Sequence, residues 1–270
     1  MPVVSDTDDC GLSAEDLEAL RVAKVKLEYP SLTARISAFV GRPLEAGVKM
    51  LPDPMHRVVN SAAKTALLKG LEFAVLTMGK RSPRRAQNWL HKALVFGTGA
   101  TGGAIGIVAL PVELPLSTCV MLRSIADVAR NQGHDPSMLD TKLACLEVFA
   151  LGGPTPADDP TESGYWVVRS ALSTYLRDAA HHIAQKGLWD QSAPAVVRLI
   201  AKIASRFSLV VTEETVAKAL PVVGGVFGGS INYLFLDHFQ DVAQGHFTVM
   251  RLEKMYGTEV VRRAYEQMVV

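Results

Sequence analysis

Two long stretches without a charged side chain constrain the fold of this chain more than any other feature. They cover residues 93–112 and 219–236. Glycine recurs at four-residue spacing in both, and on a helix this spacing strips one face of side chains so that another backbone can approach closely. We expect both stretches to form glycine-zipper helices, the first with Gly99, Gly102, Gly103 and Gly106, the second with Gly224, Gly225, Gly228 and Gly229.

The rest of the chain has helical apolar spacing, and no segment alternates like a β-strand. Ser13 followed by Asp16 is a capping-box pattern that opens a helix reaching about Glu28. Prolines in 110–115 predict two helix breaks before a helix over 116–131. Further helices are expected at 32–50 with an interruption at 41–43, and at 53–78, 141–151, 162–186, 192–207, from 212, and 258–268. The predicted fold class is an all-α multi-helix bundle.

Residues 1–11 are acidic and predict a disordered tail, which leaves 12–270 as the helical domain. A run of Gly and Pro at 152–161 is the best internal boundary, since such residues mark loops. On each side of this boundary, amphipathic helices come first and are followed by a glycine segment that lies next to a proline. This shared order raises the hypothesis of a pseudo-duplication without proving a repeat.

Charge and motifs argue against several classes of function. The 28 Lys and Arg residues nearly balance the 27 Asp and Glu residues, so no global field would gather nucleic acid. Three scattered cysteines fit a reducing compartment, and the acidic start lacks a signal-peptide pattern, so we expect a cytoplasmic protein. No phosphate-binding loop, nucleophile elbow or Cys-x-x-Cys pair is present, and we expect no cofactor.

Several strings, in order along the chain, resemble the EcsC family. They are Gly97–Gly102, Leu110–Pro115, Met121–Asp127, Cys145–Gly153, Pro221–Gly224, His238–Gln240 and Gly245–Phe247. The resemblance covers roughly Leu12 to Gly257. The family takes its name from a gene beside the Ecs ABC-transporter subunits, so the resemblance implies an accessory protein associated with a membrane rather than a particular reaction.

A membrane function is the first hypothesis. Lys80, Arg81, Arg84 and Arg85 precede the first glycine segment and could contact anionic lipid head groups. The glycine segments would then meet lipid or an integral membrane protein, which makes the protein peripheral or conditional at the inner membrane. Two alternatives stay open: the segments pack against each other in a soluble core, or their glycine faces form a homo-oligomer.

An enzyme is the alternative hypothesis, although the missing motifs make it the less favoured one. Glu113, Glu147, His238, Asp241 and His246 are the candidate catalytic residues of a metal-dependent hydrolase. His238 lies three residues before Asp241 and eight before His246, so these three could share a helix side and bind a metal. Acids in such apolar surroundings would hold protons tightly unless Arg123 or His238 pairs with them.

Overall fold

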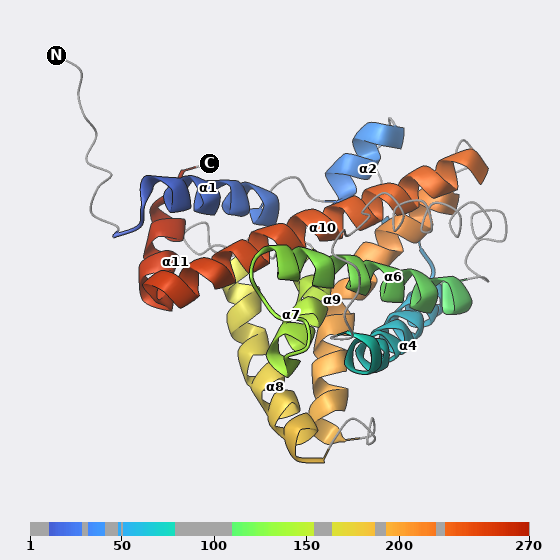
Figure 1. Cartoon of the computed structure of the whole chain (residues 1–270). Helices are drawn as coiled ribbons and strands as arrows, with labels where there is room; N and C mark the ends of the chain where they lie inside the picture. Colours follow the sequence, from blue (N-terminus) through green and yellow to red (C-terminus); the bar gives the residue numbers. More distant parts are fainter. Residues whose placement is uncertain are drawn as a thin grey trace.

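The computed structural model describes residues 11–28, 32–40, 48–49, 51–78, 110–153, 164–186, 193–219 and 225–269. Within these ranges all nine regular elements are α-helices, which confirms the predicted class (Figure 1). They are α1 (Ala14–Glu28), α2 (Leu32–Val40), α4 (Asp53–Thr77), α6 (Leu110–Asn131), α7 (Leu139–Leu151), α8 (Gly164–Lys186), α9 (Pro194–Ala219), α10 (Gly225–Tyr256) and α11 (Thr258–Gln267).

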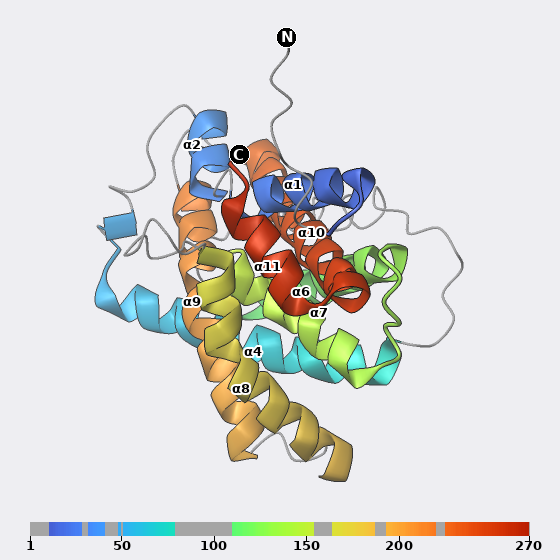
Figure 2. The same cartoon turned by 90° about the vertical axis from the view of Figure 1, so that its left-hand side faces the viewer.

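Helix α10 is the longest element and runs through the middle of the bundle. Helices α1, α2, α6, α7, α9 and α11 all contact it. Helix α4 packs across α6 and α9, and α8 lies beside α9 so that the two project from the body as a pair (Figures 1 and 2). Almost every helix is therefore positioned by reference to α10.

Aromatic rings fill the centre of the core where α7, α9 and α10 meet. The ring of Phe149 lies 4.9 Å from that of Phe207 and 5.1 Å from that of Phe239, between centroids, and Phe235 lies 5.1 Å from Phe239. All four side chains are buried. Edge-on and tilted contacts of this kind add to the stabilisation from burial. The core thus joins residues on both sides of 152–161.

Helix ends follow the local signals at two places. The Asp16 amide donates to Ser13 Oγ at 3.2 Å, which confirms the capping box that opens α1. At the end of α6, Gly133 has φ 81°, and the His134 amide donates to the Ala129 carbonyl at 3.0 Å. A glycine in this left-handed conformation closes a Schellman motif.

Two predicted interruptions were wrong. Helix α6 begins at Leu110 and includes both prolines. Pro111 is tolerated because backbone N–H groups in the first turn have no partner within the helix. Pro115 removes one backbone hydrogen bond, close to the start of the helix. Helix α9 runs unbroken through the expected gap at 208–211. The hydroxyl of Thr212 donates to the Ser208 carbonyl one turn back, at 2.7 Å, instead of capping a new helix.

Several predictions fall outside the described residues. They concern the tail at 1–10, the basic residues 80–85, the first glycine segment up to residue 109, Gly224, and most of the 152–161 boundary. Gly225, Gly228 and Gly229 lie in the first turns of α10. Within the described part of the chain, no helix has the length and apolar character needed to cross a bilayer.

Helix α1 packs directly on the backbone of α10 at Gly245. A Cβ atom there would lie 2.7 Å from Leu27 Cγ and 2.9 Å from the Ala23 carbonyl oxygen. The ammonium group of Lys24 also donates to the carbonyls of Tyr265 and Met268, at 2.8 and 2.7 Å, which ties α1 to the end of α11. Only glycine permits this crossing.

We expect Gly245→Ala to lower the free energy of unfolding by about 1 to 3 kcal/mol, because the clash with a backbone oxygen outweighs the better helix propensity of Ala. Gly70→Ala is the matched control, since its Cβ would meet Thr118 Cγ2 at an ordinary 3.5 Å. That variant should be neutral or stabilised by up to about 1 kcal/mol. Urea denaturation of both would check the contrast, and equal effects would contradict it.

Candidate functional site

A buried ionic cluster joins the three helices that flank the charge-free segments. Lys218 Nζ lies 2.9 Å from Glu113 Oε1 and 3.0 Å from Glu214 Oε1. Asn232 Nδ2 donates to Glu113 Oε1 at 3.2 Å. We call these four residues the junction cluster.

The junction cluster joins the described flanks of the two charge-free segments. Glu113, on α6, directly follows the segment 93–112. Lys218, at the end of α9, directly precedes the segment 219–236, and Asn232 on α10 lies inside it. One set of hydrogen bonds therefore holds the exit of the first segment beside the entry of the second.

The junction cluster holds two carboxylates and one ammonium group in a poorly hydrated place. The Lys218 and Glu113 side chains are each 11 % exposed, and that of Glu214 is 6 % exposed. Burial raises the pKa of Glu214, with help from Glu113 and against the effect of Lys218. Burial works to lower the pKa of Lys218, but the two carboxylates outweigh it and raise it. Lys218 thus stays charged and holds both acids.

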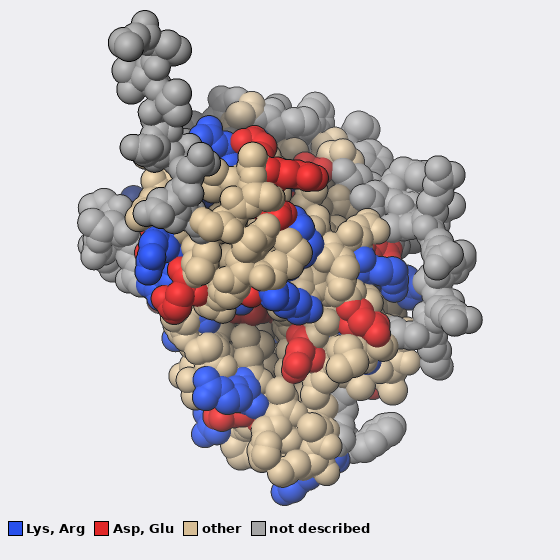
Figure 3. All heavy atoms as spheres, turned by 60° about the vertical axis from the view of Figure 1, so that its left-hand side comes forward, with Lys and Arg blue, Asp and Glu red and all other residues tan. Residues whose placement is uncertain are grey.

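Apolar side chains are exposed beside this cluster. Val112 is 69 % exposed and Leu116 is 57 % exposed, and both lie in the first two turns of α6 next to Glu113. On the face of the molecule drawn in Figure 3, the described Lys and Arg residues are interspersed with Asp and Glu among residues of other types. Two strongly exposed apolar side chains thus lie next to the junction cluster.

A second buried cluster lies where α7, α8 and α10 meet. His246 Nε2 is 3.6 Å from Glu147 Oε2, and His246 Nδ1 is 3.0 Å from the Tyr165 hydroxyl. Arg169 binds Glu253 through two nitrogen–oxygen contacts of 2.8 and 2.7 Å, and also hydrogen-bonds Tyr165. Because Tyr165 accepts from Arg169, its hydroxyl donates to His246 Nδ1, and the single N–H proton of the neutral imidazole lies on Nε2, facing Glu147.

Burial dominates the chemistry of this second cluster. It raises the pKa of Glu147 to about 7, with Arg169 opposing and Glu253 adding to the rise. It lowers the pKa of His246 well below its usual range. His246 is therefore neutral near pH 7, and Glu147 is divided between its charged and neutral forms.

His238 faces a different neighbour. Its Nε2 atom lies 2.8 Å from the Gly152 carbonyl oxygen at the end of α7, and burial lowers its pKa to about 4. A Cβ atom on Gly152 would lie 2.5 Å from Phe239 Cε1, so only glycine lets α7 end this close to α10. His238 is a neutral donor and not a base that pairs with the buried acids.

Asp241 turns toward the N-terminal helices. Arg35 NH2 lies 2.7 Å from Asp241 Oδ2, and Lys26 Nζ lies 3.1 Å from Asp241 Oδ1. Burial acts to raise the pKa of Asp241, but the hydrogen bonds from Arg35 and Lys26 outweigh it and lower the pKa. This acid fastens α1 and α2 to α10.

The five candidate catalytic residues therefore do not form one centre. Only Glu147 and His246 meet; the other three face different helices, although helical spacing along α10 placed His238, Asp241 and His246 near one another. In the described part of the chain, no group of three or more His, Cys, Asp and Glu residues is arranged to hold a metal ion. His238, Asp241 and His246, the three residues expected to share a metal ion, each contact a different partner in the described structure.

The sequence analysis missed the partners that complete these clusters. Lys218 was detectable, because it lies four residues after Glu214 on one helix face. Tyr165, Arg169 and Arg35 carry no local signal, since each meets a residue that is distant in the chain. The ionic partner of Glu113 is Lys218 and not Arg123, which was the partner expected from the sequence.

Fold and site together define a helical protein that uses buried charges to hold its helices against one another. The chain belongs to the EcsC protein family, whose family model matches residues 14–252 of its 270 residues. Neither a curated protein nor a solved structure matches it. Family membership confirms the resemblance noted in the sequence and leaves the activity to be proposed.

We expect Lys218→Met to lower the free energy of unfolding at pH 7 by about 3 to 5 kcal/mol, because two carboxylates would lose their shared buried cation. Glu113→Gln is the comparison: it leaves Lys218 paired with Glu214 and should cost only about 1 kcal/mol. The Lys218→Met deficit should shrink as the pH falls, since Glu214 then takes up a proton. Chemical denaturation at pH 7 and pH 5 measures both, and equal costs for the two variants would contradict the assignment.

A pH-dependent effect is expected for Glu147→Gln. The pKa of Glu147 rises from 4.5 to about 7 on folding, so between these pH values the folded state holds a proton that the unfolded state has lost, and stability falls as pH rises. The variant removes this loss. Its free energy of unfolding, relative to the wild type, should therefore rise by on the order of 2 to 3 kcal/mol between pH 4.5 and pH 8. A difference that does not vary with pH would exclude a raised pKa.

Proposed function

We propose that this protein acts at the cytoplasmic face of the inner membrane, as an accessory protein that docks through the end of the bundle where residues flanking its two glycine segments meet. The observation that carries the proposal is the junction cluster. Glu113, Lys218 and Asn232 hold together the flanks of both segments, so lipid or an integral membrane protein could engage the two as a unit.

The exposed side chains at this end support docking. Transfer of a fully exposed Val or Leu side chain into an apolar environment contributes roughly 1.5 to 3 kcal/mol, and Val112 and Leu116 keep most of that capacity because they are more than half exposed. The sequence adds four basic residues, Lys80, Arg81, Arg84 and Arg85, each worth about 1 kcal/mol beside anionic lipid. Contributions of this size favour reversible binding, as for other peripheral proteins.

The link to transport is part of the same proposal. The EcsC family is named for its gene neighbourhood beside ABC-transporter subunits, and glycine faces allow close packing against a transmembrane helix. The same docking surface would thus bind either an integral membrane protein or the lipid itself. Self-association through the glycine faces would appear as a concentration-dependent mass.

Flotation with liposomes tests the docking surface. We expect the protein to float with vesicles that contain anionic lipid, less so at high salt, since salt screens the basic residues. Val112→Gln combined with Leu116→Gln should reduce the floated fraction at least several-fold. The matched control is Met255→Gln with Val260→Gln, which removes apolar side chains that are 54 % and 37 % exposed at the opposite end of α10 and should have no effect.

A second pair of variants tests the glycine faces themselves. Gly103→Leu with Gly228→Leu should abolish flotation while the far-ultraviolet circular dichroism stays helical. Binding to native inner membranes but not to protein-free liposomes would assign the recipient to an integral protein. Failure to bind either, or equal loss in the Met255 and Val260 control, would overturn membrane docking.

A further inference from the structure

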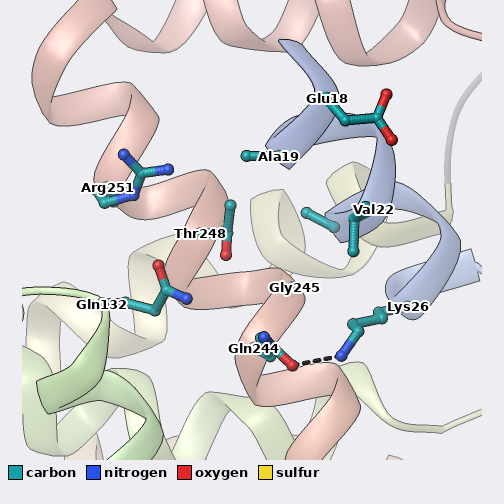
Figure 4. Close-up of a pocket in the computed structure, with 10 residues that line it drawn as sticks. Glu18, Ala19, Val22, Lys26, Gln132, Gln244, Gly245, Thr248 and Arg251 are labelled. Carbon is teal, nitrogen blue, oxygen red and sulfur yellow. Dashed lines mark hydrogen bonds between the residues drawn. The ribbon is translucent and has the colours of Figure 1, made fainter. Parts of the chain in front are cut away.

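A cavity of about 240 Å³ lies between α1 and the last third of α10, beside the end of α6 (Figure 4). It is far from the junction cluster along α10. Its wall on the α1 side includes the apolar Val22 and Ala23, whereas polar side chains come from α1, from α10 and from the residue that follows α6. These are Glu18, Lys26, Gln132, Gln244, Thr248 and Arg251.

The cavity results from the way in which α1 crosses α10. Gly245 lets the two backbones touch at one point, and ionic contacts fasten α1 on either side of that point. Asp16 Oδ1 is 3.2 Å from Arg251 NH1, and Lys26 Nζ is 3.1 Å from Asp241. The hollow between these two contacts is therefore held open by fixed elements.

Polar groups in the lining retain hydrogen-bonding capacity. Within the described structure, the side-chain amide of Gln132 and the hydroxyl of Thr248 engage no protein partner, although Thr248 as a residue is only 6 % exposed. Both side chains lie toward the cavity in Figure 4. Gln244 accepts a hydrogen bond from Lys26 through its carbonyl oxygen, which leaves its amino group as a donor.

Two cations line the cavity, Lys26 and Arg251, and Lys26 is paired with Asp241. Arg251 uses one nitrogen on Asp16, and its guanidinium group carries further N–H donors that an acidic group could engage. Glu18 is the acid of the lining; it points away from the cavity in Figure 4 and lies 3.8 Å from Arg21 on the outer side of α1. Guanidinium groups bind carboxylate and phosphate well.

We propose that this cavity binds a small anionic polyol, a hydroxylated molecule with one phosphate or carboxylate group. The acidic group would lie at Arg251, and hydroxyl groups would pair with Gln132, Gln244 and Thr248. A volume equal to that of about eight water molecules fits a ligand with on the order of ten non-hydrogen atoms. Such a group occurs both in free metabolites and in the head groups of glycerol phospholipids.

Isothermal titration calorimetry with glycerol 3-phosphate, D-glycerate and uncharged glycerol tests the site. We expect the two anions to bind and glycerol not to bind at 10 mM. Thr248→Val, which keeps the shape of the side chain, and Gln132→Leu should each weaken glycerol 3-phosphate binding about 3- to 10-fold. Thr65→Val on α4 is the matched control and should bind like the wild type, because Thr65 donates to the Ser61 carbonyl and lies away from the cavity.

Vesicles of phosphatidylglycerol separate the two sources of the ligand. Binding of soluble glycerol 3-phosphate that Thr248→Val weakens assigns a free metabolite, and vesicle binding that the same variant weakens assigns a lipid head group. No binding of either anion in either form, or binding that Thr248→Val and Gln132→Leu leave unchanged, would overturn the site. These variants leave Val112 and Leu116 intact, so the outcome is independent of the junction-end experiments.

Discussion

A helix of 32 residues in the middle of a bundle needs partners for the polar side chains that it carries, and α10 pairs four of them with different helices at successive turns. Asn232 meets α6, His238 meets the end of α7, Asp241 meets α1 and α2, and His246 meets α8. The positions of the surrounding helices follow from these contacts. The phenylalanine rings fill the remaining space, so packing and polar matching agree on one arrangement.

Most of the fold could be predicted from local signals, because capping residues and apolar spacing act within one or two turns. The Ser13 capping box was predicted correctly for this reason. Pro115 and Thr212 were not, because a proline near a helix start and a hydroxyl bonded one turn back are tolerated inside a helix. The tertiary packing that keeps α6 and α9 continuous cannot be predicted from signals that act within one or two turns.

The site was predicted less well, because its chemistry depends on contacts between distant segments. The acids Glu113 and Glu147 were correctly placed in apolar surroundings, and Glu147 does meet His246. That Lys218 pairs with Glu113, and that the charge of Arg169 acts on Glu147, became known only once the helices were placed. Helical spacing gives the face on which His238, Asp241 and His246 lie, but 3.6 residues per turn spreads them enough to reach separate neighbours. Because of that spread, each of the three residues contacts a different helix instead of sharing one metal ion.

The contact of α1 with Gly245 joins segments more than 200 residues apart in the chain. During synthesis, α1 leaves the ribosome long before its partner, and its buried residues Leu20 and Ala23 have nothing native to cover them until α10 follows. Contacts of such sequence separation are slow to form, and uncovered apolar surface promotes aggregation. Newly made chains would therefore spend this interval exposed to chaperones and proteases, so the supply of folded protein depends on how quickly the final quarter is translated.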